Sequence, residues 1–140
     1  MNKWDYRFIG LAELVSSWSK DPSTKVAAVI VDNNKRIISI GFNGYPQRIP
    51  DDDLHIRELK YAKIIHAEQN CLAFSNTDVT GYSLYCTHCP CSQCASMIIQ
   101  RGITKVIFKK PEKEFYARWK ESNRISMEMF MLAGVTVIEI

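Results

Sequence analysis

The chain has 140 residues, of which 46% are hydrophobic and 11% aromatic, and its formal net charge is +3. This size and composition are typical of a globular protein, and we expect one domain over residues 1–140. No apolar run approaches the roughly 20 residues that cross a bilayer, and the amino terminus lacks a secretory signal pattern, which predicts a cytoplasmic protein without a membrane partner. The small net charge argues against a nucleic-acid partner, because nucleic-acid-binding domains concentrate many more basic residues on one face.

The first part of the chain predicts a helix, a hairpin and a loop. Apolar residues recur at helical spacing over residues 4–18, and a proline soon after prevents the helix from continuing. Residues 25–32 and 36–43 are rich in valine and isoleucine and predict two strands joined by an Asn-Asn turn. Residues 44–60 contain prolines and consecutive acidic residues, which predict a surface loop.

The rest of the chain alternates helices and strands. The pattern predicts, in order, helix 66–75, strand 82–87, a helix from Pro90 to about residue 100, strand 105–108, helix 112–133 and strand 135–140. A helix between the last two strands favours a parallel crossover. We therefore predict an α/β fold with a five-stranded mixed sheet between helices, in which the fifth strand is parallel to its neighbour.

Three of the five cysteines lie in the short stretch "CPCSQC", at the start of a predicted helix. A cytoplasmic protein does not normally hold disulfides, so metal binding or redox chemistry is the leading interpretation. The Cys91 and Cys94 pair suits either a zinc site or a thioredoxin-like redox pair, since a helix N-terminus stabilises a thiolate in both cases. Taken alone, this motif does not distinguish the two.

The stretch "HAE" favours zinc over redox chemistry. It places His66 and Glu68 at the start of another predicted helix. One imidazole and two thiolates supply three ligands and leave the fourth position of a tetrahedral zinc open, as in a catalytic site. A zinc ion lowers the pKa of bound water from about 15.7 toward about 7, and a carboxylate such as Glu68 can then take its proton.

"HAE" followed by "PCSQC" resembles the signature of the zinc-dependent nucleobase deaminases. The resemblance implies one catalytic zinc per chain, held by His66, Cys91 and Cys94, with Glu68 as general acid and base. The stretches "DPSTKVAAVIV", "GFNGYP" and "HAEQN" look most like the deoxycytidylate branch of the cytidine deaminase superfamily. That branch implies a three-layer fold with helices on both faces of the sheet, a small nucleotide as substrate, hydrolysis of dCMP to dUMP and ammonia, and a homo-oligomer, either a dimer or a hexamer.

Four residues are candidates for binding the nucleotide. Asn43 is a turn residue for which the resemblance implies an additional hydrogen bond to the sugar. Lys25, at the start of the first strand, is a candidate for the 5′-phosphate, although a lysine there is often only solvated. Tyr116 and Arg118 follow the fourth strand, where a ligand crevice can form, or belong to an ordinary helix with a solvated face.

Other functions and other cysteine roles stay open at this point. The substrate could be another cytosine deoxynucleotide such as dCTP. A tRNA adenosine deaminase would share the zinc and Glu68 but should need a more basic surface, and a noncatalytic zinc or thiol-redox module would leave Glu68 unexplained. We interpret Cys89 as a thiol that does not bind the zinc, and Cys71 and Cys86 as small buried apolar residues.

Overall fold

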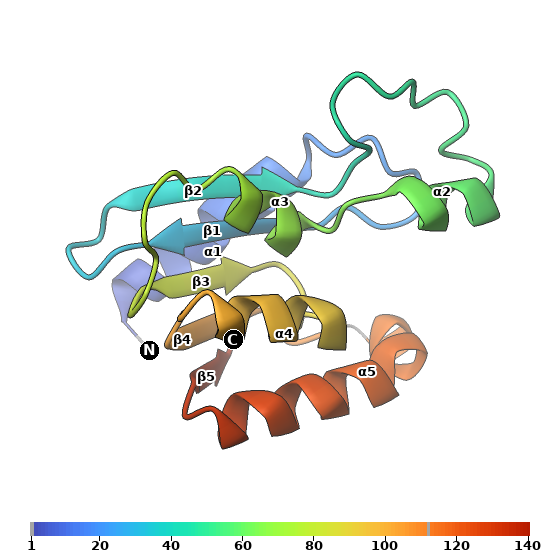
Figure 1. Cartoon of the computed structure of the whole chain (residues 1–140). Helices are drawn as coiled ribbons and strands as arrows, with labels where there is room; N and C mark the ends of the chain where they lie inside the picture. The colour runs from blue at the N-terminus through green and yellow to red at the C-terminus, as the bar shows by residue number, and fades with distance from the viewer. Residues whose placement is uncertain (1, 112) are drawn as a thin grey trace.

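The computed structural model describes residues 2–111 and 113–140, and only the backbone for residues 113–118. The helices and strands follow in the order α1 (Lys3–Ser16), β1 (Ala27–Val31), β2 (Ile37–Phe42), α2 (Arg57–Lys63), α3 (Ala67–Ala73), β3 (Ser83–Cys86), α4 (Ser92–Gln100), β4 (Lys105–Phe108), α5 (Lys113–Leu132) and β5 (Thr136–Glu139) (Figure 1). None of the described helices is long and apolar enough to span a membrane.

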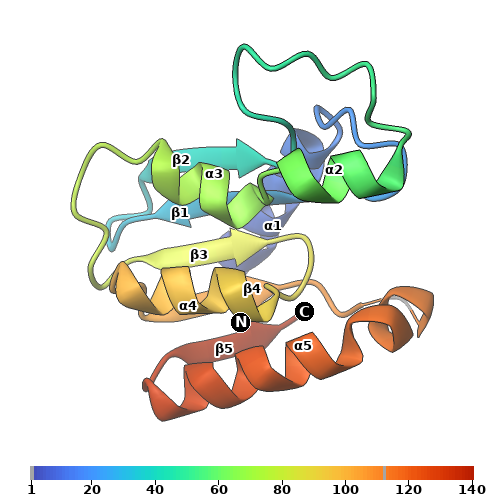
Figure 2. The ribbon, with the colours of Figure 1, turned by 45° about the vertical axis from the view of Figure 1, so that its right-hand side comes forward.

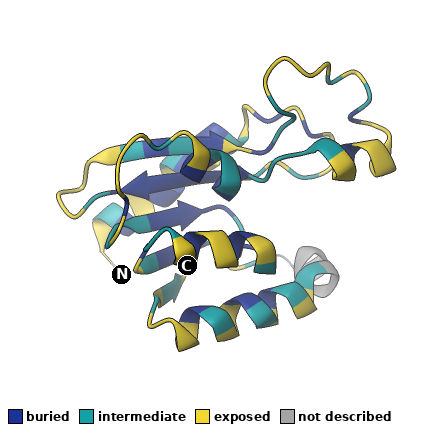
Figure 3. Cartoon of the chain, in the orientation of Figure 1, coloured by how far each residue is buried: buried dark blue, intermediate teal, exposed yellow. Residues whose placement is uncertain are grey.

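The five strands form one mixed sheet in the order β2-β1-β3-β4-β5. Strand β1 is antiparallel to both β2 and β3, whereas β3, β4 and β5 run parallel to one another. All five residues of β1 are buried (Figure 3), because helices cover both faces of the sheet at this strand. The prediction of a five-stranded mixed sheet with a parallel fifth strand is confirmed.

The helices form a layer on each face of the sheet, which confirms the three-layer prediction. Helix α1 covers one face, and its apolar residues pack on Val29, Tyr85 and Ile107. Helices α3, α4 and α5 cover the other face. Helices α3 and α4 both begin beyond the same ends of the strands (Figure 2). The described side chains of this second core include Ala28 and Ile30 of β1.

A glycine lets α3 lie close to β2. A Cβ atom at Gly41 would lie 2.4 Å from the Cys71 amide nitrogen and 2.6 Å from the Ala67 carbonyl oxygen, so no other residue fits without moving the helix. Because α3 begins directly after His66, this contact also fixes the position of the "HAE" stretch.

Two local predictions differ from the structure. Helix α2 begins within residues 44–60, which were predicted as loop, and it lacks a side-chain cap that would have indicated its start. Pro90 was predicted in the first turn of a helix, but it precedes Cys91, which is the N-cap of α4. Pro90 therefore lies directly before the N-cap of α4 and not within its first turn.

Candidate active site

The ends of two helices bring together the three predicted zinc ligands. His66 is the N-cap of α3, Cys91 is the N-cap of α4, and Cys94 lies in the first turn of α4. The Nδ1 atom of His66 lies 3.4 Å from the Cys91 sulfur and 3.3 Å from the Cys94 sulfur. Their ligand atoms all lie within 4.8 Å of one another. One nitrogen and two sulfurs at this separation fit a tetrahedral zinc ion.

The electrostatics of this cluster favour a thiolate. The contact with the Cys94 thiol lowers the pKa of Cys91 most, and burial opposes this effect. The contact with His66 lowers the pKa further, so that the pKa of Cys91 falls to about 4. The contact with Cys91 raises the pKa of Cys94 in turn, as does burial, because the Cys94 thiol is the donor to the Cys91 thiolate. A bound dication would deprotonate both thiols, which is the form that binds zinc.

Glu68 is a buried carboxyl beside the cluster. Its side chain lines the same pocket as His66 and Cys91, and the residue is only 4% exposed. Burial raises the pKa of Glu68, which moves it toward the pH range in which a carboxyl both takes up and releases protons. The Cys86 thiol donates a hydrogen bond to Glu68 Oε1 at 3.4 Å, a contact that the interpretation of Cys86 as an apolar residue did not foresee.

The pocket in front of Glu68 encloses about 680 Å³, its open mouth included. One wall comes from the segment between α1 and β1 and from α2, and the described part of α5 supplies another with Trp119 and Asn123. A ligand that enters this pocket therefore reaches Glu68.

Asn43 lines this pocket and is held in one orientation. Its Oδ1 accepts a hydrogen bond from the Val26 amide at 2.9 Å, while its Nδ2 donates to the Thr24 carbonyl at 2.9 Å and to Asp21 Oδ2 at 3.3 Å. Both amide donors are used, but a carboxamide oxygen can accept a second hydrogen bond. Asn43 can thus receive a hydrogen bond from a ligand hydroxyl.

The other predicted nucleotide contacts are placed differently. Lys25 is exposed, its ammonium donates to the Ser19 carbonyl, and it is absent from the described lining of the pocket. The side chains of Tyr116 and Arg118 lie outside the described residues. The pocket instead contains Lys60, which sequence reasoning missed because a lone lysine in a polar loop carries no signal of burial.

The remaining cysteines stand apart from the ligand cluster. Cys71 and Cys86 are fully buried, as expected for small apolar residues. Cys89 lines the pocket and is 8% exposed, and burial raises its pKa to about 12, which keeps it a neutral thiol. Among the described residues, the group that can hold a metal consists of His66, Cys91 and Cys94 alone.

Two curated proteins are similar to this chain over nearly its whole length. The chain is 49% identical over 138 residues to a protein of Aliivibrio fischeri named "Uncharacterized deaminase in luxG 3'region", a match that covers 98% of this chain and 93% of that protein. It is 38% identical over 142 residues to the human deoxycytidylate deaminase, with 96% of this chain and 78% of that protein covered.

A solved structure and a family model agree with these relatives. The dCMP deaminase of the cyanophage S-TIM5, solved in complex with dCMP and dUMP, superposes with a TM-score of 0.78 at 28% identity, over 100% of this chain and 99% of that one. Residues 2–110 match the family model described as "Cytidine and deoxycytidylate deaminase zinc-binding region". This matched range contains Glu68 and the three residues of the cluster. The chain therefore belongs to the zinc-binding cytidine and deoxycytidylate deaminase family.

Proposed function

We propose that this protein hydrolyses dCMP to dUMP and ammonia, with His66, Cys91 and Cys94 as zinc ligands and Glu68 as the proton carrier. The observation that carries this proposal is the buried carboxyl of Glu68, which shares one pocket with the histidine and cysteine cluster and whose pKa is raised by burial. A structural zinc site or a redox pair has no use for such a carboxyl.

The chemistry follows from the groups in the pocket. Zinc supplies Lewis-acid activation of water when it is bound. Glu68 takes a proton from the attacking water and donates one to nitrogen 3 of the cytosine ring, which makes carbon 4 electrophilic. Once the water oxygen has added to carbon 4, Glu68 takes the second proton from that oxygen and delivers it to the 4-amino group. The carbon–nitrogen bond then breaks, ammonia leaves, and the oxygen remains as the 4-carbonyl of uracil. The Cys86 thiol, which donates to Oε1, holds the carboxyl in place.

The assignment to dCMP is supported by the relatives and by Asn43. The human relative carries the name deoxycytidylate deaminase, and the phage structure holds dCMP and dUMP. The open acceptor position on Asn43 suits a sugar hydroxyl, which is a donor that a free base lacks. Related nucleotides such as dCTP share the base and sugar, and only a direct comparison separates them. We also propose a homo-oligomer, which light scattering can size.

Ammonia release from a panel of substrates tests the proposal. The panel contains dCMP, dCTP, deoxycytidine and a tRNA anticodon stem-loop with adenosine at the wobble position, each with the zinc-loaded protein and with Glu68→Gln as the matched inactive control. We expect dCMP to be the best substrate. Release from the stem-loop alone would favour the tRNA adenosine deaminase alternative, and no release from any substrate would favour a noncatalytic module.

A further inference from the structure

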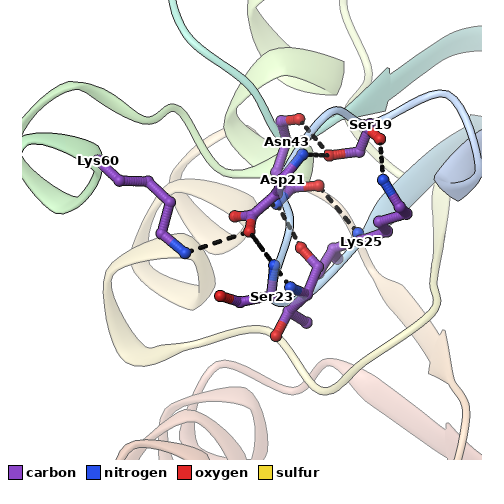
Figure 4. A network of polar contacts seen from close by, with 8 residues as sticks. Ser19, Asp21, Ser23, Lys25, Asn43 and Lys60 are labelled. Carbon is purple, nitrogen blue, oxygen red and sulfur yellow. Dashed lines mark hydrogen bonds and ion pairs between the residues drawn. The ribbon is translucent and has the colours of Figure 1, made fainter. Parts of the chain in front are cut away.

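The ammonium of Lys60 is buried at the wall of the pocket and faces Asp21. Its Nζ lies 3.1 Å from Asp21 Oδ1, and both side chains are 6% exposed. Figure 4 shows Lys60 reaching Asp21 from α2, while Lys25 lies on the other side of Asp21 and points to Ser19. A buried ion pair is weak evidence for stability, because desolvation of both charges offsets most of their attraction. The position of this pair at a pocket indicates another role.

The aspartate of this pair has few free acceptor positions, but the lysine has free donors. Asp21 Oδ1 also accepts from the Ser23 and Thr24 amides, and Oδ2 accepts from Asn43. A lysine ammonium has three N–H donors, and among the described residues Asp21 is its single hydrogen-bond acceptor. The Tyr61 ring lies 5.3 Å from the nitrogen and offers a π face only. Two donors of a buried ammonium therefore lack a hydrogen-bond acceptor within the described part of the chain.

Lys60 also differs in charge from the rest of the pocket. It is the only lysine or arginine among the described residues that line the pocket, which also contains the carboxyls of Asp21 and Glu68. A nucleotide differs from a nucleoside by its phosphate, which offers only acceptor oxygens and negative charge at neutral pH. An ammonium with free donors matches that group, and charge-assisted hydrogen bonds are stronger than neutral ones.

We propose that Lys60 is a specificity-determining residue that hydrogen-bonds the phosphate of the substrate, and that Asp21 is a positioning residue that holds the ammonium at the pocket wall. This inference rests on the proposed function, since it names the group that selects a nucleotide over a nucleoside. It also replaces Lys25 as the phosphate contact, because the Lys25 ammonium donates to the Ser19 carbonyl and Lys25 is absent from the described lining of the pocket.

The test compares Lys60→Met with Lys63→Met as a matched control. Lys63 lies on the same helix and pairs with Asp53 at 2.6 Å, but it is absent from the described pocket lining. We expect Lys60→Met to lower kcat/KM for dCMP by about ten- to a hundred-fold and to leave deoxycytidine within about threefold, the effect of one lost charged hydrogen bond. Lys63→Met should change neither substrate.

Two further variants guard against a trivial loss of folding. Removing Lys60 alone leaves the Asp21 carboxylate buried without its cation, so the double variant Asp21→Asn/Lys60→Met removes both charges. It should fold and still show the reduced preference for dCMP. Lys60→Arg, which retains a cation and its donors, should restore much of the preference.

Three results would overturn the assignment of Lys60. If Lys60→Met lowers kcat/KM equally for dCMP and deoxycytidine, the ion pair has a structural role only. If the preference of Lys60→Met for dCMP is unchanged, Lys60 does not contact the phosphate. If the preference is lost in Lys25→Met alone, Lys25 is the phosphate contact. If the parent protein deaminates neither substrate, the proposed function fails, but calorimetry with dUMP and deoxyuridine still tests the lysine. Lys60→Met should then weaken the binding of dUMP and leave the binding of deoxyuridine unchanged. Equal binding of dUMP by Lys60→Met and by Lys63→Met would reject Lys60.

Discussion

The two faces of the sheet carry two buried carboxyls with opposite properties. On the α1 face, Asp5 is 1% exposed and accepts hydrogen bonds from the Tyr85 hydroxyl at 2.7 Å and from Lys105 at 3.5 Å. Burial alone would raise the pKa of Asp5, but the Tyr85 hydroxyl, the Asn2 amide and Lys105 together hold the pKa below its usual 3.8. This carboxyl is an ionised group whose partners all belong to the fold.

Glu68, on the other face, shows what happens when such partners are weak donors. The thiols of Cys86 and Cys94 contact its carboxyl, but thiols are weak donors. Burial therefore outweighs the lowering effect of Cys94 and His66 and raises the pKa of Glu68. The small residues Gly41, Ala67 and Cys71 let α3 lie close to the sheet here and bring this carboxyl to the metal cluster. A buried acid thus stays ionised and stabilises the fold when strong donors surround it, and it is available for proton transfer when its donors are weak.

Removal of the two cysteines should produce the largest effect. The double variant Cys91→Ser/Cys94→Ser loses two of the three ligands, so we expect loss of zinc and of all measurable turnover, with the sheet and α1 intact by circular dichroism. Metal analysis should give one zinc per chain for the parent protein and for Cys89→Ser. Two zinc ions per chain, or full zinc retention in the double variant, would show that another group is a ligand.

The Glu68→Gln substitution separates proton transfer from metal binding. The amide keeps the shape of the side chain but cannot carry protons, so turnover of dCMP should fall by about a hundred- to ten-thousand-fold. Zinc content and nucleotide binding should be unchanged. Activity within about tenfold of the parent protein would remove Glu68 from the mechanism.

On the opposite face, Asp5→Asn should affect stability and not chemistry. A hydrogen bond to a charged group contributes about 1.5–3 kcal/mol, so urea unfolding should show a loss of that order. The variant should keep the dCMP kinetics of the parent protein at a temperature where both are folded. A large fall in kcat without a fall in stability would break the distinction between the two faces.

The pH dependence of unfolding gives the smallest of these effects. Because the folded-state pKa of Asp5 is lowered, its contribution to stability is complete above about pH 3.8 and is lost as the pH falls through the folded value. The difference in unfolding free energy between the parent protein and Asp5→Asn should therefore shrink below pH 3.8. A difference that grows toward low pH would contradict the sign of the shift.

Those features of the fold and site that depend on local patterns could be predicted from the sequence. The apolar runs of β1 and β4 and the helical spacing of α1 identified the sheet and its covering helices, and "HAE" with "PCSQC" identified the cluster at the starts of α3 and α4. These two motifs were sufficient to identify the cluster because each cluster residue lies at a helix start or within one turn of it.

The features that were missed depend on contacts between distant segments. Lys60 is buried because α2 folds back onto Asp21, and nothing in a polar stretch with prolines indicates that contact. Lys25 was predicted at the start of the first strand with its ammonium available to a ligand, but the ammonium donates a hydrogen bond to the Ser19 carbonyl. The hydrogen bond from Cys86 to Glu68 joins β3 to α3, and a sequence pattern cannot distinguish such a cysteine from an apolar one.

The most direct test of the account follows the atoms of the reaction. The zinc-loaded protein is incubated with dCMP in ¹⁸O-labelled water, and the products are analysed by mass spectrometry alongside an ammonia assay. We predict dUMP that carries a single ¹⁸O at carbon 4 and an equal amount of ammonia, with both products formed at least about a hundredfold more slowly by Glu68→Gln. The absence of dUMP, or dUMP without the label, would contradict hydrolytic deamination at this site.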